Sequence, residues 1–403
     1  MLPIDKALEQ RVQIQATVFS GHVPLLGLLS KGFNGVKILS VFNNKGGVGK
    51  TTLTYHLAHS LSEAGYKVLL LDADPQCNLT IYSMPVETIH DMWEKEDSCV
   101  ELGIEEFRKN KSAQEIDDLE AETRSLHYLL QPTIDGTGDY ERLPPPHKIT
   151  RNLHIIPGRL SIHEFEEKIS SRWSDAYRGD ALAIRTITKI RSLSEEYAKK
   201  NKYDFVIVDT SPSLGSLNKT IISTVDGFFV PAAPDMFSLY GIRNIGSSLR
   251  KWHEEFDIIY KLISKDKRKL FPAEFVKFLG YTIYNARKYT KHSSKWNLAQ
   301  AHLKYALQIP DIINTHIGAD LRKGISDDLL SEPIGGESVM HGHNTFPSLA
   351  QHYRVPMWKI PKIPRLDKEH QNTVNGQKPD ILATKEKYKE FSDSLIERIE
   401  LIG

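Results

Sequence analysis

The sequence has little cysteine, no long apolar run and almost no net charge, and each absence narrows what the protein can be. Cys77 and Cys99 are the only cysteines in 403 residues, which excludes a disulfide framework and predicts a reducing, cytoplasmic location. No apolar run approaches the ~20 residues that span a bilayer. Asp5 and Glu9 stand where a secretory signal would be basic, so we expect none. A formal charge of +1 means that any nucleic-acid surface must be a local patch.

The remaining composition is that of an ordinary globular protein, with 40% hydrophobic and 26% charged residues. A chain of this length can bury a large core, either as two domains or as one large α/β domain with insertions. Residues 1–35 precede the first predicted strand and are too short to fold alone. Their spaced apolar residues predict a helical extension that packs on the main domain or contacts a partner. These apolar residues are Leu8, Val12, Ile14, Val18 and Leu25.

The most informative stretch is residues 36–52, VKILSVFNNKGGVGKTT. A β-branched and apolar run predicts a buried strand, and a glycine-rich turn and a helix over 51–64 follow it. Glycines let backbone N–H groups surround a phosphate at the positive end of the helix. Lys50 is then expected to reach the β and γ phosphates, and the Thr51 hydroxyl to bind magnesium. The residues expected to line the nucleotide are consecutive: Lys45, Gly46, Gly47, Val48, Gly49, Lys50, Thr51 and Thr52.

Residues 45–52 resemble the deviant Walker A loop of the ParA/MinD ATPases, in which a signature lysine precedes the glycines. Asn44 stands where the general phosphate-loop pattern has glycine, and Lys45 occupies the signature position. The resemblance implies ATP and Mg²⁺ as cofactors. It also implies that Lys45 crosses to the nucleotide of a second subunit, so that ATP promotes a homodimer.

Two further segments carry the acids that such a site requires. A predicted strand over 67–71 is followed by Asp72 and Asp74, in a stretch that resembles the family's DxDPQxNxT pattern. The resemblance implies that Asp74 orients the attacking water and that Asp72 supports magnesium; capping of the next helix is the alternative. Four apolar residues followed by Asp209 predict a Walker B strand that holds magnesium through water. Ser211 replaces a proline of the family's switch loop, which leaves the stiffness of that loop open.

The predicted fold is α/β, a doubly wound and mostly parallel sheet with flanking helices, formed by residues 36–403. Insertions are expected at about 84–150 and 288–355. The first should hold solvated helix over residues 94–122 and a loop over 132–146. Two residues match the family's adenine contacts: Asn285, at the end of a predicted strand, and Pro361, in a base loop after a last strand within 357–364. The resemblance covers about two thirds of the chain, most specifically 36–80 and 203–241.

Two acid-free runs, 275–310 and 338–366, concentrate basic residues. They suit non-specific phosphate contact with DNA, although a solvated surface is the alternative. The basic residues are Lys277, Arg287, Lys288, Lys291, Lys295, Lys304, Arg354, Lys359, Lys362 and Arg365. The predicted function is therefore a dimeric ATPase for plasmid or chromosome partition, stimulated by a partner of ParB type. The other hypothesis is an ATPase that positions a protein cargo without binding DNA.

Three other functions are disfavoured by particular residues. An iron–sulfur carrier would need a bridging cysteine pair, and Cys77 directly follows the switch aspartates. A membrane-binding terminal helix would need a basic face, whereas residues 386–400 carry an acidic one, so we expect this helix to pack on the core and no membrane partner. The pair formed by His341 and His343 is too isolated for a metal site and predicts a loop.

Overall fold

The computed structural model describes residues 35–272, 274–288 and 295–403. The predicted helical extension of residues 1–35 lies outside these ranges apart from Gly35. The described residues form a seven-stranded sheet in the order β3-β4-β2-β5-β1-β6-β7. The strands are β1 (Lys37–Val41), β2 (Val68–Asp72), β3 (His147–Lys148), β4 (Leu153–Ile156), β5 (Phe205–Asp209), β6 (Gly227–Ala232) and β7 (Lys277–Ile283).

Every strand pair is parallel except β3 with β4. The central strands are buried along their whole length, which explains their continuous β-branched and apolar sequences. The predicted doubly wound, mostly parallel sheet is therefore confirmed.

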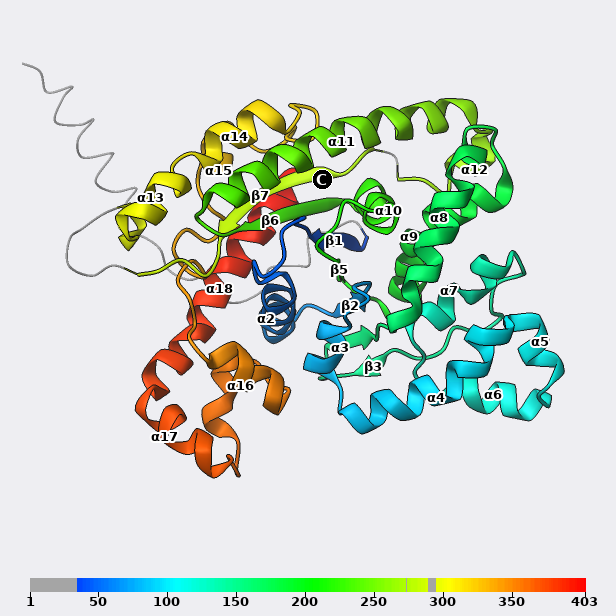
Figure 1. Cartoon of the computed structure of the whole chain (residues 1–403), viewed down its shortest axis with the longest axis horizontal. Coiled ribbons are helices and arrows are strands. Elements are labelled where there is room, and N and C mark those ends of the chain that lie inside the picture. Colours follow the sequence, from blue (N-terminus) through cyan, green and yellow to red (C-terminus); the bar gives the residue numbers. More distant parts are fainter. Residues whose placement is uncertain (1–34, 273, 289–294) are drawn as a thin grey trace, which may run out of the picture. The chain divides into compact units, whose positions relative to one another are not determined.

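Helices cover both faces of the sheet (Figure 1). On one face, α2 (Lys50–Glu63) packs against the C-terminal helix α18 (Lys378–Leu401). On the other lie α9 (Ala181–Asn201), α10 (Ser216–Thr224) and α11 (Met236–Leu262). The apolar stripe of α18 is buried, as predicted, and the Phe391 ring lies 5.8 Å from that of Phe229 on β6. The terminal helix thus packs on the core.

The sheet register gathers three strand ends at one edge. Val41 of β1 and Asp72 of β2 both pair with Asp209 of β5, so the loops that follow these strands meet. Ligands bind at such carboxyl edges in doubly wound sheets because the helix N-termini and loop side chains converge there. The phosphate loop follows β1 at this edge.

The first insertion is more ordered and more buried than predicted. It contains α4 (Val86–Leu102), α5 (Ile104–Lys109), α6 (Ala113–Ala121) and α7 (Leu126–Asp135), and α3 (Asn78–Ser83) precedes it. The expectation of solvated helix is wrong at Glu96 and Cys99, which are buried. The predicted loop begins only at Gly136, because α7 continues through Pro132. Proline leaves the carbonyl of Tyr128, four residues earlier, without a helical donor, and the Tyr140 hydroxyl donates to it at 2.8 Å.

The polypeptide between β4 and β7 supplies α8 (His163–Ala176), preceded by η1 (Leu160–Ile162), and α12 (Lys265–Arg268). After β7 come η2 (Lys295–Asn297), α13 (Gln300–Ala306), α14 (Ile309–His316), α15 (Asp327–Ser331), α16 (Phe346–Tyr353), η3 (Met357–Lys362) and α17 (Lys368–Gly376).

The predicted last strand within 357–364 is wrong, since this segment is the 3-10 helix η3. Pro361 cannot donate to a sheet ladder. The Met357 N–H donates to His56 Nε2 at 3.2 Å, and Trp358 Nε1 to Glu63 Oε1 at 3.0 Å, so η3 packs along α2 instead of joining the sheet.

Candidate nucleotide site

The phosphate loop depends on glycine at two positions. Gly47 and Gly49 have φ of 72° and 79°, in the left-handed region. A Cβ on Gly49 would lie 2.2 Å from Tyr284 Cε1, so any side chain there would collide with the tyrosine ring. Tyr284 follows β7 and is buried. Sequence analysis did not identify this contact, which links two segments more than 230 residues apart.

The N-terminus of α2 is open to an anion. Its N-cap is Gly49, no side chain caps it, and its first turn holds no acid. The first-turn N–H groups of a helix have no intrahelical acceptor, and the dipole of this 14-residue helix adds positive potential. Lys50 Nζ lies 3.3 Å from the Lys45 carbonyl, and burial lowers the pKa of Lys50. The loop therefore offers backbone donors and one buried cation to a phosphate.

Asn43 holds the start of the loop in place. It is buried, its Nδ2 donates to the Pro231 carbonyl at 2.7 Å, and its Oδ1 accepts from the Lys45 N–H at 2.9 Å. These bonds tie the loop to β6. An amide residue at the end of an apolar strand was the signal in the sequence, but Asn43 was not among the predicted site residues.

Two buried carboxylates face each other beside the loop. Asp72 accepts from Thr80 N–H at 2.8 Å and from Thr80 Oγ1 at 2.6 Å. Asp209 accepts from Thr54 Oγ1 at 3.4 Å, and the Thr51 hydroxyl also bonds it. Burial raises the pKa of Asp72 to about 7 and that of Asp209 to about 8, and the charge of Asp72 raises the pKa of Asp209 further. We call Asp72 and Asp209 the carboxylate pair.

These residues fit a magnesium ion. Asp209 Oδ2 is buried without a hydrogen-bond partner among the described residues, which is costly unless a ligand or ion completes it. Thr51 and Asp209 provide the hard oxygen donors that Mg²⁺ prefers, while both Asp72 oxygens accept bonds from the protein. Thr51 and Asp209 would hold the ion and Asp72 would support them. Bound there, Mg²⁺ would neutralise phosphate charge. The structure thus brings together the three residues predicted to serve the metal.

The three residues predicted to be catalytic are not all close to one another. Asp74 is buried, its Oδ1 accepts from the Gln76 N–H at 3.0 Å, and its charge acts on both Lys50 and Asp209. Lys45 turns elsewhere, with Nζ 2.5 Å from Asp235 Oδ2. Asp235 was not predicted; it also caps α11 by accepting from the Ser238 N–H at 2.8 Å.

The switch loop over 210–215 is held firmly despite its serine substitution. Asn218 Nδ2 donates to the carbonyls of Ser211 and Ser213 at 2.8 and 2.9 Å. Ser211 Oγ lies 3.1 Å from Ser213 Oγ. These hydrogen bonds tie the backbone at Ser211 and Ser213 to Asn218 of α10.

The two predicted adenine contacts lie in different places. Asn285 directly follows Tyr284, has φ of 58° and is exposed, so it borders the phosphate loop through its neighbour. Pro361 lies in η3, where Lys359 pairs with Glu63, the last residue of α2, at 2.8 Å. The structure does not bring Pro361 to the phosphate loop. Both contacts stay predictions.

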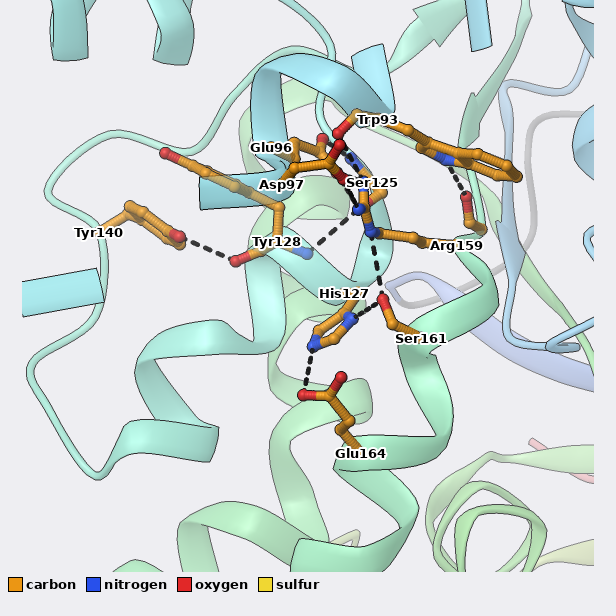
Figure 2. Close-up of polar contacts among 11 residues, drawn as sticks. Trp93, Glu96, Asp97, Ser125, His127, Tyr128, Tyr140, Arg159, Ser161 and Glu164 are labelled. Atoms are coloured by element: carbon orange, nitrogen blue, oxygen red, sulfur yellow. Dashed lines mark hydrogen bonds and ion pairs between the residues drawn. The ribbon is translucent and has the colours of Figure 1, made fainter. Parts of the chain in front are cut away.

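A second buried polar cluster lies beside this site (Figure 2). Arg159 contacts Asp97, and its Nη1 lies 3.5 Å from Glu96 Oε2. The two Glu96 oxygens accept from Ser125 N–H at 2.7 Å and Ser125 Oγ at 2.6 Å. We call Glu96, Asp97, Ser125 and Arg159 the arginine cluster. Sequence analysis missed it because it joins α4, α7 and the end of β4.

Short hydrogen bonds connect the arginine cluster to the carboxylate pair. Trp93 Nε1 donates to the Gly158 carbonyl at 3.1 Å, and Gly158 N–H donates to Thr80 Oγ1 at 2.7 Å (Figure 2 shows the first). Thr80 Oγ1 in turn donates to Asp72. The first insertion therefore rests directly on residues that position Asp72.

The two basic runs are partly neutralised in space. Lys277 pairs with Glu274 at 2.7 Å and Lys295 with Glu332 at 2.9 Å, in addition to the Lys359–Glu63 pair. Lys291 lies outside the described residues. Six basic residues are exposed and have no ion pair within the described ranges: Arg287, Lys288, Lys304, Arg354, Lys362 and Arg365.

Across the described residues, no helix has the length and apolarity to cross a membrane. His341 and His343 lie in a loop, as predicted, with the ring of His343 6.2 Å from that of Tyr284.

Comparison with known proteins agrees with this geometry. A family model described as an AAA domain matches residues 36–261. A putative replication protein A of Rhizobium rhizogenes is 29% identical over 210 residues, 52% of this chain and 43% of that protein. The chromosome partitioning protein ParA of Caulobacter vibrioides is 25% identical over 218 residues, 54% of this chain and 64% of that protein. The chain spans about half the length of the curated relatives it matches.

A solved structure shares the fold of this chain. The structure of pNOB8 ParA superposes with a TM-score of 0.53 at 19% identity, over 91% of this chain and 99% of that one. That likeness concerns the fold, while the family match covers the phosphate loop, the carboxylate pair and the switch loop. The chain belongs to this AAA-domain family and is a P-loop protein of the ParA/MinD type.

Proposed function

We propose that this protein is a Mg²⁺-dependent ATPase of the ParA type, which dimerises on ATP and hydrolyses it to ADP and phosphate. The observation that carries the proposal is the unpartnered Asp209 oxygen beside Thr51, at the uncapped N-terminus of α2. A buried carboxylate oxygen that has no partner among the described residues, next to an anion site, suits a metal–phosphate pair better than a purely structural role.

The site separates binding from chemistry. Lys50 and the first turn of α2 would grip phosphate in the ground state, whereas Asp74 would align the attacking water with the γ-phosphoryl group. Asp74 suits this role because it is buried close enough to act electrostatically on both Lys50 and Asp209. Only Asp74 would therefore act mainly in the transition state.

Dimerisation is supported by the surroundings of Lys45. Its ion pair with Asp235 is partly exposed, with side chains 26% and 40% accessible, and such pairs contribute only about 0–1 kcal/mol. Lys45 can therefore exchange Asp235 for the phosphates of a second copy at small cost. Met236, Phe237 and Tyr240 are exposed on the first turns of α11 beside it, which provides apolar surface for that contact.

The activity is tested by two substitutions with opposite effects. Lys50→Ala should weaken ATP binding about 100-fold or more, because a buried phosphate contact is lost. Asp74→Ala should bind ATP within a few-fold of wild type but lower the rate of hydrolysis about 100-fold. Glu87→Ala, at an exposed position in the first turn of α4, is the control. Wild-type turnover by Asp74→Ala would falsify its assignment, and tight ATP binding by Lys50→Ala would remove the proposed site.

We infer that the work of this ATPase is DNA partition, supported by the ParA name of relatives and by the six unpaired basic residues. If these residues contact phosphates, duplex affinity must fall steeply with salt and show little sequence preference. Two copies of each patch should bind more tightly in the ATP dimer. A ParB-type protein is the proposed activator. A protein cargo without DNA remains the alternative.

Charge reversal distinguishes the two roles. Arg354→Glu with Arg365→Glu should reduce ATP-dependent duplex binding at least ~10-fold. The matched control is Lys277→Glu with Lys295→Glu, because these lysines are already paired with acids. Equal binding in ATP and ADP, or equal losses in both double variants, would favour the protein cargo.

A further inference from the structure

Three metal-ligating side chains meet where α16 ends and α17 begins, and none of them belongs to the nucleotide site. His352, Asp367 and His370 each offer a ligand atom, and these atoms lie within 4.8 Å of one another. His352 Nε2 is 2.7 Å from Asp367 Oδ2, and His370 Nδ1 is 3.7 Å from the same oxygen. Asp367 and His370 are one helical turn apart, so the start of α17 fixes their spacing.

The Asp367 carboxylate forgoes the bond that its position normally makes. Asp367 is the N-cap of α17, where an aspartate usually accepts a first-turn N–H, yet its side chain makes no capping bond. It faces the two imidazoles instead. The Tyr353 hydroxyl accepts from the Asp367 N–H at 2.9 Å and lies 2.8 Å from His370 Nδ1. This hydroxyl holds the Asp367 backbone, and a metal ion that binds His370 Nδ1 would replace the hydroxyl on that nitrogen.

We propose that His352, Asp367 and His370 bind one divalent transition metal ion of the Zn²⁺ class. Two imidazoles and one carboxylate suit Zn²⁺, whereas Mg²⁺ and Ca²⁺ require oxygen ligands throughout. Tetrahedral ligands at about 2.0–2.2 Å from Zn²⁺ lie roughly 3.4 Å apart, a value between the two observed separations from Asp367 Oδ2. Half of the His352 side chain is exposed, so the ion enters from solution and water completes its shell.

The metal would join α16 to α17 across the connection of residues 354–366. This connection carries four basic residues, Arg354, Lys359, Lys362 and Arg365, each a trypsin cleavage site. An ion that binds only the folded arrangement stabilises it by mass action. Zn²⁺ binding should therefore protect this connection from trypsin, and the effect needs no nucleotide.

The experiment is calorimetric titration of the full chain with Zn²⁺, in excess Mg²⁺ and ADP to occupy the nucleotide site. Wild type should bind one Zn²⁺ that His352→Ala, Asp367→Asn and His370→Ala each weaken at least ~10-fold, and Tyr353→Phe less. The control is His90→Ala, which removes an exposed histidine on α4. Because His352 and Asp367 are half exposed, these variants should fold, and unchanged ATP turnover checks this.

Trypsin protection gives a second readout. Zn²⁺ should slow cleavage within residues 354–366 in wild type and His90→Ala, and leave the rate unchanged in the three ligand variants. Equal Zn²⁺ affinity in wild type and all three variants would overturn the proposal. The proposal would also be overturned if wild type showed no micromolar Zn²⁺ binding stronger than that of His352→Ala.

Discussion

The carboxylate pair and Glu96 of the neighbouring arginine cluster are all fully buried, yet they differ in how their oxygens are satisfied. Burial raises the pKa of Asp72, Asp209 and Glu96 alike. Both Glu96 oxygens accept from Ser125 and face Arg159, while Asp209 Oδ2 has no partner in the described structure. A raised pKa thus marks burial, and the missing partner marks the place for a ligand.

This difference assigns distinct roles to two clusters joined by the Thr80–Gly158–Trp93 bonds. The arginine cluster holds the first insertion against the end of β4, so its loss should cost stability. In the carboxylate pair, the unsatisfied oxygen of Asp209 lowers stability, so replacing Asp209 should impair function more than stability. The predictions that follow test this division.

The largest effect is expected at Glu96. Glu96→Ala leaves Ser125 and Arg159 without their buried partner, and removing one member of a buried pair costs about 3–5 kcal/mol. The free energy of unfolding from urea titration should fall by about that amount. Glu106→Ala is the matched control, because Glu106 pairs with Lys109 at 3.2 Å on the surface and should change stability by less than about 1 kcal/mol. Equal losses would contradict a structural role for Glu96.

Asp209→Asn should show the reverse pattern. The amide keeps the shape of the side chain but holds Mg²⁺ poorly, so we expect hydrolysis to fall about 100-fold, which corresponds to about 2.7 kcal/mol. Stability should not fall, since the amide is neutral at every pH, whereas burial disfavours the ionised form of the carboxyl. Phosphate release and urea titration on the same samples measure both. A variant that hydrolyses ATP normally, or that unfolds as readily as Glu96→Ala, would break the comparison.

A smaller effect concerns pH. A carboxyl whose folded pKa is raised contributes stability below its unfolded pKa, near 4, and loses it as pH rises through the folded pKa, about 8 for Asp209. Between pH 6.5 and 8, wild type should therefore lose on the order of 1–2 kcal/mol relative to Asp209→Asn. Titrating groups that do not interact with Asp209, including the buried histidines, cancel in this difference, whereas Asp72 contributes to it through its charge. If the free energy of unfolding changed with pH in parallel for the two proteins, the folded-state pKa of Asp209 would not be raised.

The smallest effect is expected at Asp235. Asp235→Asn keeps an acceptor for the Ser238 N–H but removes the ion pair with Lys45. Stability should change by less than about 1 kcal/mol, while ATP-dependent dimerisation should become slightly tighter because Lys45 is released. Sedimentation at several protein concentrations would show this, and a weaker dimer would mean that Asp235 helps Lys45 instead of competing with it.

Local motifs made the nucleotide site predictable. Residues 45–52 and Asp74 come just after a strand, Asp72 and Asp209 are the last residues of theirs, and a parallel sheet must gather such ends at one edge. Tyr284 against Gly49 and Asp235 against Lys45 were not predictable, because they arise from contacts far apart in the sequence. Distant contacts also explain the wrong prediction for residues 357–364, because packing of this segment on α2 favours a 3-10 helix over a strand. Sequence analysis also did not identify the acids that neutralise Lys277, Lys295 and Lys359.

The central claim, that ATP and Mg²⁺ at this site join two copies through Lys45, is tested most directly by sedimentation velocity of wild type and Lys45→Ala. Wild type should be a dimer with ATP and Mg²⁺ and a monomer with ADP. Lys45→Ala should bind ATP but stay a monomer in both. The account would be contradicted if Lys45→Ala formed as much ATP-dependent dimer as wild type, or if wild type had the same oligomeric state with ATP and with ADP.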